Sequence, residues 1–241
     1  MAINVNKVYR VVLAILNKEQ RGYLTPDQFN RLGRQAQLDL FEKSFYDYNR
    51  QLTKRNIQGV NSEYGDIADN IEEKIDLFAK SSGLTLVSSG TYSAPADLYR
   101  TIQITTSNGL TEVEKIKKSE YSYYSSSQLS APSASYPVYY FDNNVFKVFP
   151  TSVSSPVINY IRIPADPIWG FTGGGASAFV YDSSAYNEST GDGSRDFELH
   201  PSDETDLVIK ILSYAGVIIK DPTVIQVAQQ QEANNVTLEN S

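Results

Sequence analysis

The sequence has no cysteine, one histidine, one tryptophan, one methionine and no long apolar run. Without cysteine there is no disulfide framework, no thiol nucleophile and no zinc site of the cysteine type. No apolar stretch approaches the length of a membrane-spanning helix. Lys7 and Arg10 interrupt the N-terminal residues 1–16, where a signal peptide would be apolar. We therefore expect a soluble, unprocessed protein, and the lack of cysteine fits a reducing compartment.

Positive charge is also scarce, because the sequence has 21 Lys and Arg but 28 Asp and Glu, which gives a formal net charge of -7. Such a chain is a poor nucleic-acid binder, since phosphate contacts need clustered cations. The same charge suits a surface past which DNA slides without sticking. The 41% of hydrophobic residues across 241 positions is typical of a globular protein, and 17 Tyr with 10 Phe indicate β structure and contact surfaces.

Helical periodicity marks both ends of the chain. Apolar residues recur at i, i+3 and i+4 over residues 4–17. Thr25, Pro26 and Gln28 predict a capped helix start, with a capping box between Thr25 and Gln28, for a helix that runs to about residue 54. A third helix is expected over 62–79, and a C-terminal helix capped by Ser202 or Asp203, with a short further helix after Pro222.

The middle of the chain changes to a period of two. Strands are expected at 84–88, 98–106, 138–141, 145–149 and 157–163, with an ambiguous short strand at 112–117 and another at 197–199. In the second of these, Leu98, Ile102 and Ile104 should share one face. Asn143 and Asn144 form a turn that tolerates positive φ, so residues 138–163 predict an antiparallel meander. The Gly/Ser-rich stretch 170–195 predicts an extended hairpin or mobile loop.

These patterns predict an α+β fold. The N-terminal and C-terminal helices would form one helical bundle, and an antiparallel β domain would be inserted between them. The expected segments are 1–82 for the N-terminal helices, 83–200 for the β domain with Ser/Tyr-rich and Gly/Ser-rich loops, and 201–241 for the returning C-terminal helices.

Two stretches imitate ligand-binding motifs. Residues 17–28 resemble a calcium loop, with Gly22 at the sixth position, but Arg21 stands at a ligand position and Gln28 replaces the bidentate glutamate. A helix-turn-helix connection explains this stretch better. The triple glycine 173–175 lacks the Lys-Ser/Thr pair of a phosphate loop, so flexibility is the better interpretation. We expect no metal ion and no cofactor.

Catalytic residues are equally hard to find. His200, with Ser202 and Asp203 close by, is the only possible Ser-His-Asp site, but a strand-to-helix junction explains this position more simply. Asp97 and Asp166 could be paired carboxylates of a glycosidase, although nothing in the sequence brings them together. We therefore expect no catalytic residues and no enzymatic activity.

The Ser/Tyr-rich segment 119–136 is a better functional candidate. Tyr121, Tyr123, Tyr124 and Tyr136 could contact a protein or stack on sugars, and a solvated loop partly covering the sheet is the alternative at each position. Together with Trp169, these side chains would serve a peripheral module that binds a glycan or receptor.

Several segments together resemble one family. They are residues 6–50 (beginning NKVYRVVLAILNK), YSAPADLYR at 92–100, YFDNNVFKVFPTSVSSPVINYIRIPADPIWGF at 140–171, and DFELHPSDETDLVIKILSYAGVIIKD at 196–221. This combination is similar to the structural proteins of tailed bacteriophages. It most resembles the head-to-tail adaptor or connector ring proteins of short-tailed phages, including those of the crAss-like type.

The resemblance implies a structural virion protein of the portal-tail region, assembled in the cytoplasm of a host bacterium. It implies a homo-oligomeric ring, commonly a dodecamer, that docks on the portal protein, contacts other tail or ring proteins and extends the channel through which DNA passes without specific binding. Family adaptors combine a helical bundle with a β domain, which agrees with the fold expected above. The family has no active-site residues to transfer.

Overall fold

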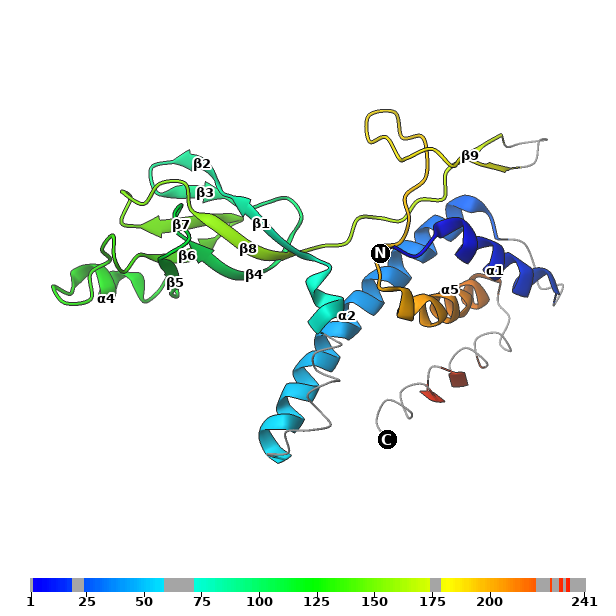
Figure 1. Cartoon of the computed structure of the whole chain (residues 1–241), viewed down its shortest axis with the longest axis horizontal. Coiled ribbons are helices and arrows are strands. Elements are labelled where there is room, and N and C mark those ends of the chain that lie inside the picture. Colours follow the sequence, from blue (N-terminus) through cyan, green and yellow to red (C-terminus); the bar gives the residue numbers. More distant parts are fainter. Residues whose placement is uncertain are drawn as a thin grey trace. The chain divides into compact units, whose positions relative to one another are not determined.

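The computed structural model describes residues 2–18, 24–58, 72–173 and 179–219, together with residues 226, 230, 231, 233 and 234. These residues form two compact units (Figure 1). Residues 1–77 and 164–241 belong to a helical unit, and residues 78–163 form a β unit. Several predictions fall outside the described residues. They concern Gly22, most of the expected third helix, Gly174 and Gly175, and the expected helix after Pro222.

The helical unit contains α1 (Val5–Lys18), α2 (Pro26–Gln58) and α5 (Glu204–Ile219), the last preceded by the 3-10 turn η1 (Pro201–Asp203), and residues 72–76 are also helical. The apolar stripe of α1 is buried, and α5 packs against both α1 and α2. The predicted capping box is confirmed, because Thr25 N donates to Gln28 Oε1 (3.0 Å) and Gln28 N donates to Thr25 Oγ1 (3.3 Å). The helical bundle made from both ends of the chain is therefore confirmed.

Residues 164–199 belong to the helical unit, whereas the sequence assigned them to a β domain of 83–200. Buried Gln37 on α2 explains this, because its amide holds two distant segments. Its Nε2 donates to Ala165 O (2.8 Å), and its Oε1 accepts from Glu198 N (2.9 Å). Phe197 forms a single antiparallel bridge with Ile3, so the strand expected at 197–199 is reduced to that bridge.

The β unit contains one eight-stranded sheet in the order β1-β8-β4-β5-β6-β7-β3-β2. All neighbours are antiparallel except β5 and β6. The strands are β1 (Ala79–Gly83), β2 (Thr85–Ser88), β3 (Thr91–Ser93), β4 (Leu98–Thr105), β5 (Glu112–Lys115), β6 (Val138–Asp142), β7 (Val145–Phe149) and β8 (Val157–Arg162).

The sheet closes on itself through one continuous segment. β1 and β2 stand at opposite ends of the strand order, yet only Leu84 separates them in sequence. The first half of this segment pairs with β8 and the second half with β3, which gives a barrel-like unit. Its interior is a cluster of buried side chains drawn from around the sheet: Leu84, Tyr92, Ile104, Val113, Tyr139, Phe146, Val148, Val153, Ile158 and Tyr160.

The structure corrects two strand predictions. β6 and β7 form the expected hairpin, with Asn143 and Asn144 at φ 47° and 63°, but β8 pairs with β1 and β4 rather than with β7, so the meander is wrong for its third strand. Bulges in β4 also break its alternation. Ile104 is buried, whereas Ile102 is 58% exposed, so the two do not share a face.

A short helix and a short ribbon also belong to the described residues. Helix α4 (Tyr121–Ser126) lies beside β5 in the β unit (Figure 1), close to the helical turn expected at 119–124. In the helical unit, β9 (Phe171–Thr172) and β10 (Val180–Tyr181) form a two-stranded antiparallel ribbon. We call these two strands the arm, and the hairpin predicted within 170–195 is confirmed there.

Candidate functional site

His200 is a helix cap. It precedes η1, and its Nδ1 accepts a hydrogen bond from Ser202 N (3.2 Å) while lying 2.8 Å from Ser202 Oγ. Asp203 contacts Ser202 Oγ (3.3 Å) and Lys74 Nζ (2.6 Å). In a Ser-His-Asp triad the carboxylate holds the second nitrogen of the imidazole, and here it holds the serine and a lysine instead. These contacts cap the 3-10 turn η1, which leads directly into α5.

Asp97 lies at the centre of a polar cluster in the β unit. Its carboxylate accepts from Lys80 Nζ (2.9 Å) and from the hydroxyl of Tyr160 (2.8 Å). Burial acts to raise the pKa of Asp97, but the hydrogen bonds from Lys80 and Tyr160 outweigh it, so the pKa lies below its ordinary value of 3.8. The hydrogen bond to Asp97 raises the pKa of Lys80 above 10.5. The cluster ties β1 to β8 and to the residues before β4.

We expect the substitution Asp97→Asn to destabilise the protein near neutral pH and to have little effect in acid. Because the pKa of Asp97 is lower in the folded state, its stabilisation is present above about pH 4 and is lost as the pH falls through the folded-state pKa. Urea midpoints of wild type and variant at pH 7 and pH 3 measure this difference. The control is Asp192→Asn, because this side chain is exposed. A difference in urea midpoint between wild type and Asp97→Asn that is the same at both pH values would contradict the prediction.

Asp166 has a cationic partner of its own. It belongs to the helical unit, where its Oδ1 lies 3.0 Å from Arg34 Nε, whereas Asp97 belongs to the β unit. Each carboxylate therefore has its own cation. Within the described residues no group of three or more His, Cys, Asp or Glu is placed to hold a metal ion. Gln28, at the end of the calcium-like stretch, is used by the capping box.

Trp169 is not a stacking surface for sugars, so its predicted role in a glycan-binding module is wrong. The side chain is 5% exposed. Its ring centroid lies 4.4 Å from that of Tyr9 on α1 and 5.6 Å from that of Tyr181 on β10. Its Nε1 donates to Asn6 Oδ1 (3.1 Å), and its backbone N and O are both bound by the side chain of Asn30. Trp169 attaches the arm to the helices.

The tyrosines of 119–136 divide into two groups. Tyr121 stacks on Phe149 with centroids 4.2 Å apart, and it packs with Tyr124 against a buried cluster of the sheet. Tyr123 and Tyr136 face outward at 76% and 80% exposure, and the nearby Leu129 is 98% exposed. One pair of tyrosines thus fixes the segment to the sheet, and the other pair is free to contact a partner.

Sequence reasoning missed the polar side chains that organise residues 164–199. Gln37 and Asn30 lie on α2 and bind backbone atoms about 130 to 160 residues away. Asp196 similarly accepts from Val5 N (2.8 Å) at the start of α1. The one available signal was the presence of amides on the apolar side of a predicted helix, since a buried amide must find partners.

The polar clusters described above hold the fold together, while large apolar side chains face outward. This combination is typical of a structural protein that assembles with other proteins. The model of the SU10 adaptor protein family matches residues 26–175, which is more than half of the chain. The chain therefore belongs to the SU10 adaptor protein family.

Family membership makes the chain a bacteriophage structural protein of the adaptor type, a virion component that interacts with other phage structural proteins. The matched range covers α2, the whole β unit and the start of the arm, so it includes two of the quoted segments in full. A comparison with curated proteins finds no match. No helix in the described part of the chain has the length and apolarity to span a membrane.

Proposed function

We propose that the protein forms a ring at the portal vertex that connects the capsid portal to the tail and extends the DNA channel. The match to the SU10 adaptor protein family carries this proposal. The protein acts by binding and not by catalysis. Copies of one chain close into a ring when a head-to-tail contact repeats around an axis, and twelve copies are the number that the resemblance implies.

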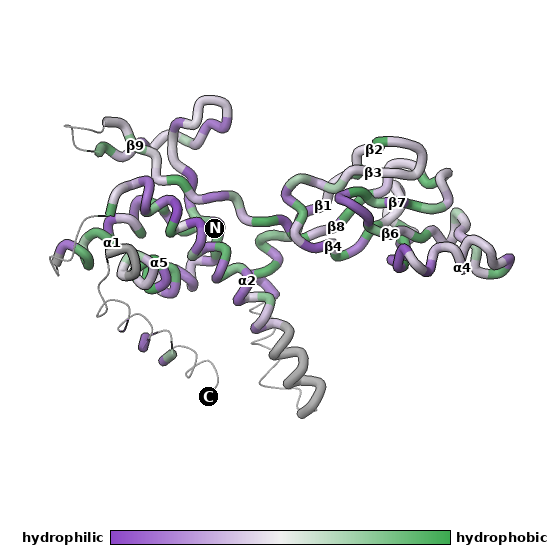
Figure 2. The backbone as a smooth tube through the Cα atoms, turned by 180° about the vertical axis from the view of Figure 1, so that it is seen from behind, coloured by the Kyte–Doolittle hydropathy of each residue, from purple (hydrophilic) through white to green (hydrophobic). Residues whose placement is uncertain are grey.

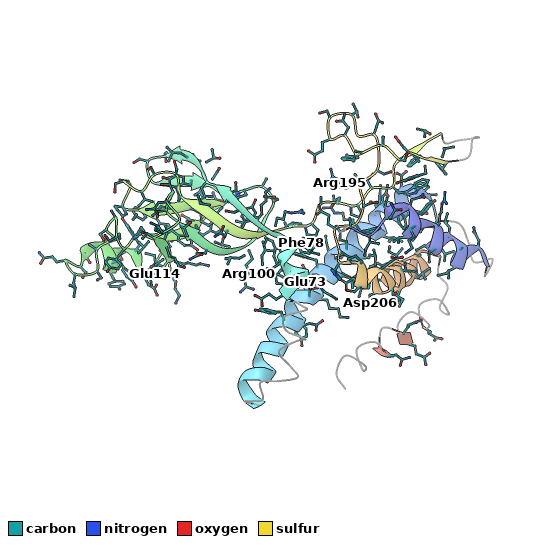
Figure 3. All side chains as sticks on the ribbon, in the orientation of Figure 1. Glu73, Phe78, Arg100, Glu114, Arg195 and Asp206 are labelled. Atoms are coloured by element: carbon teal, nitrogen blue, oxygen red, sulfur yellow. The ribbon has the colours of Figure 1, made fainter. Side chains whose placement is uncertain are left out.

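The charge distribution supports a channel that DNA passes without binding. The β unit carries seven Lys and Arg against five Asp and Glu, a net charge of +2, while the rest of the chain carries 14 against 23, a net charge of -9. Figure 3 labels one charged residue of each unit, the cationic Arg100 on β4 of the β unit and the anionic Asp206 on α5 of the helical unit. An acidic helical unit repels phosphate, so DNA moves past it freely.

Negative-stain electron microscopy of the purified protein, alone and mixed with its portal ring, tests the proposal. We expect ring-shaped particles, or an extra layer on the portal whose symmetry gives the copy number. A protein that stays monomeric and leaves the portal bare would overturn the proposal. Binding to an isolated glycan, with no particle on the portal, would favour a peripheral module that uses Tyr123 and Tyr136.

A further inference from the structure

Although the sheet closes through β1, β2 keeps one unpaired edge, because β8 pairs with β1 and not with β2. Among the described strands it pairs only with β3, and a bulge leaves Val87 without a partner there. Leu86 and Val87 are 61% and 62% exposed, so two adjacent apolar side chains of β2 lie open to solvent in this chain. Part of β2 is coloured hydrophobic in Figure 2.

Edge strands of soluble proteins normally carry Lys, Pro or other charges that prevent pairing with another chain. β2 has none of these, and residues 81–96 contain no charged side chain. An apolar edge left open in this way is suited to an added strand, because the new backbone hydrogen bonds form without burying a charge. β2 therefore has the properties of an interface strand.

The arm has matching properties in the helical unit. β9 and β10 are two residues long and pair with each other, and so short a ribbon has little stability of its own. Val180 is 59% exposed, and residues 167–181 contain no charged side chain. Trp169 and Phe171 hold the root of the arm in place, with centroids 6.0 Å apart. The arm thus presents an open, uncharged edge on an ordered base.

We propose that β10 of one copy adds to the outer edge of β2 in a second copy. This inference rests on the proposed ring, because the pairing of β10 with β2 would be the contact between neighbouring copies that closes the ring. The two edges belong to different units, so the contact is head-to-tail, as ring closure requires. Charge favours the same partner, since the unit that carries β2 is net positive and the unit that carries β10 is net negative.

The absence of cysteine permits a direct test, because introduced thiols are the only ones present. Val87→Cys and Val180→Cys are purified separately, mixed in equal amounts under mild oxidation and run on a non-reducing gel. We expect a disulfide-linked dimer from the mixture, none from either variant alone, and a ladder of higher multimers from the double variant. Only a contact between copies can link two separate variants.

Leu129→Cys, mixed with Val180→Cys, is the matched control, because this side chain is 98% exposed and lies outside both edges. A mixture that yields no more dimer than the control overturns the inference. Rings seen by microscopy in the same sample would then leave the proposed function standing. Dimers from Val87→Cys alone would also overturn it, because β2 would then pair with itself around a twofold axis.

A charge introduced on the edge of β2 provides a second, independent test. Val87→Lys should abolish rings while leaving the circular dichroism spectrum of the protein unchanged, because the side chain is already in water in the single chain. Leu129→Lys should leave the rings intact. Wild-type rings that survive Val87→Lys would contradict the inference, and loss of rings in both variants would count against a specific role for β2.

Discussion

Trp169→Ala should destabilise the helical unit by about 3–5 kcal/mol, the usual cost of removing a large buried aromatic side chain. The indole packs against Tyr9, Phe171 and Tyr181, and its N–H reaches Asn6. Truncation leaves a cavity where the arm meets α1 and α2. It also leaves Asn6 without the indole N–H as its hydrogen-bond donor, so packing and polar terms change in the same direction.

Urea unfolding followed by circular dichroism measures this loss. Leu129→Ala is the control, because a side chain that is 98% exposed should change stability by less than about 0.5 kcal/mol. Trypsin provides a local readout, since Arg195 is the only Lys or Arg between residues 163 and 209. We expect faster cleavage there in Trp169→Ala. A loss below about 1 kcal/mol would show that the arm does not depend on the indole.

Gly170→Ala should be nearly as damaging, for a steric reason. A Cβ at Gly170 would overlap the backbone carbonyl of Gly193, and neither backbone can move without breaking the hydrogen bonds from Gly170 N to Ser194 Oγ and from Asp182 N to Gly170 O. We expect a cost of roughly 2–4 kcal/mol, from overpacking together with these lost hydrogen bonds.

Gly191→Ala separates this contact from backbone strain. Gly191 has φ +77°, but no atom lies within 4 Å of the point where a Cβ would stand, so the variant should lose only about 1 kcal/mol from the left-handed conformation. Urea unfolding of the two variants gives the comparison. Equal losses would mean that the close approach of Gly170 and Gly193 contributes nothing beyond conformational preference.

Local patterns in the sequence predicted much of the fold. The apolar period of α1, the capping box of Thr25 and Gln28, and the turn at Asn143 and Asn144 each depend on neighbouring residues, and the structure confirms all three. The α+β class followed from the change of period along the chain. These features need no knowledge of distant contacts.

The errors came from pairings between distant residues. β8 pairs with β1, about eighty residues away, and no local pattern favours that neighbour over β7. Ile102 turned outward because bulges shifted its register, and such shifts are set by the partner strand. Trp169 has a large apolar ring that is equally suited to a binding surface or to a core, and only the positions of Tyr9 and Asn30 decide between them.

The place where the chain enters and leaves the β unit has an evolutionary consequence. The chain enters the unit at Phe78 and leaves it at Ile163, and these ends lie side by side, since Phe78 O accepts from Arg162 N (2.9 Å) and Ala79 pairs with Ile161. A segment whose ends meet can be lengthened, replaced or transplanted while the host scaffold keeps its connectivity. Residues 78–163 therefore have the connectivity of an insert, which could be exchanged between related chains while the helices stay the same.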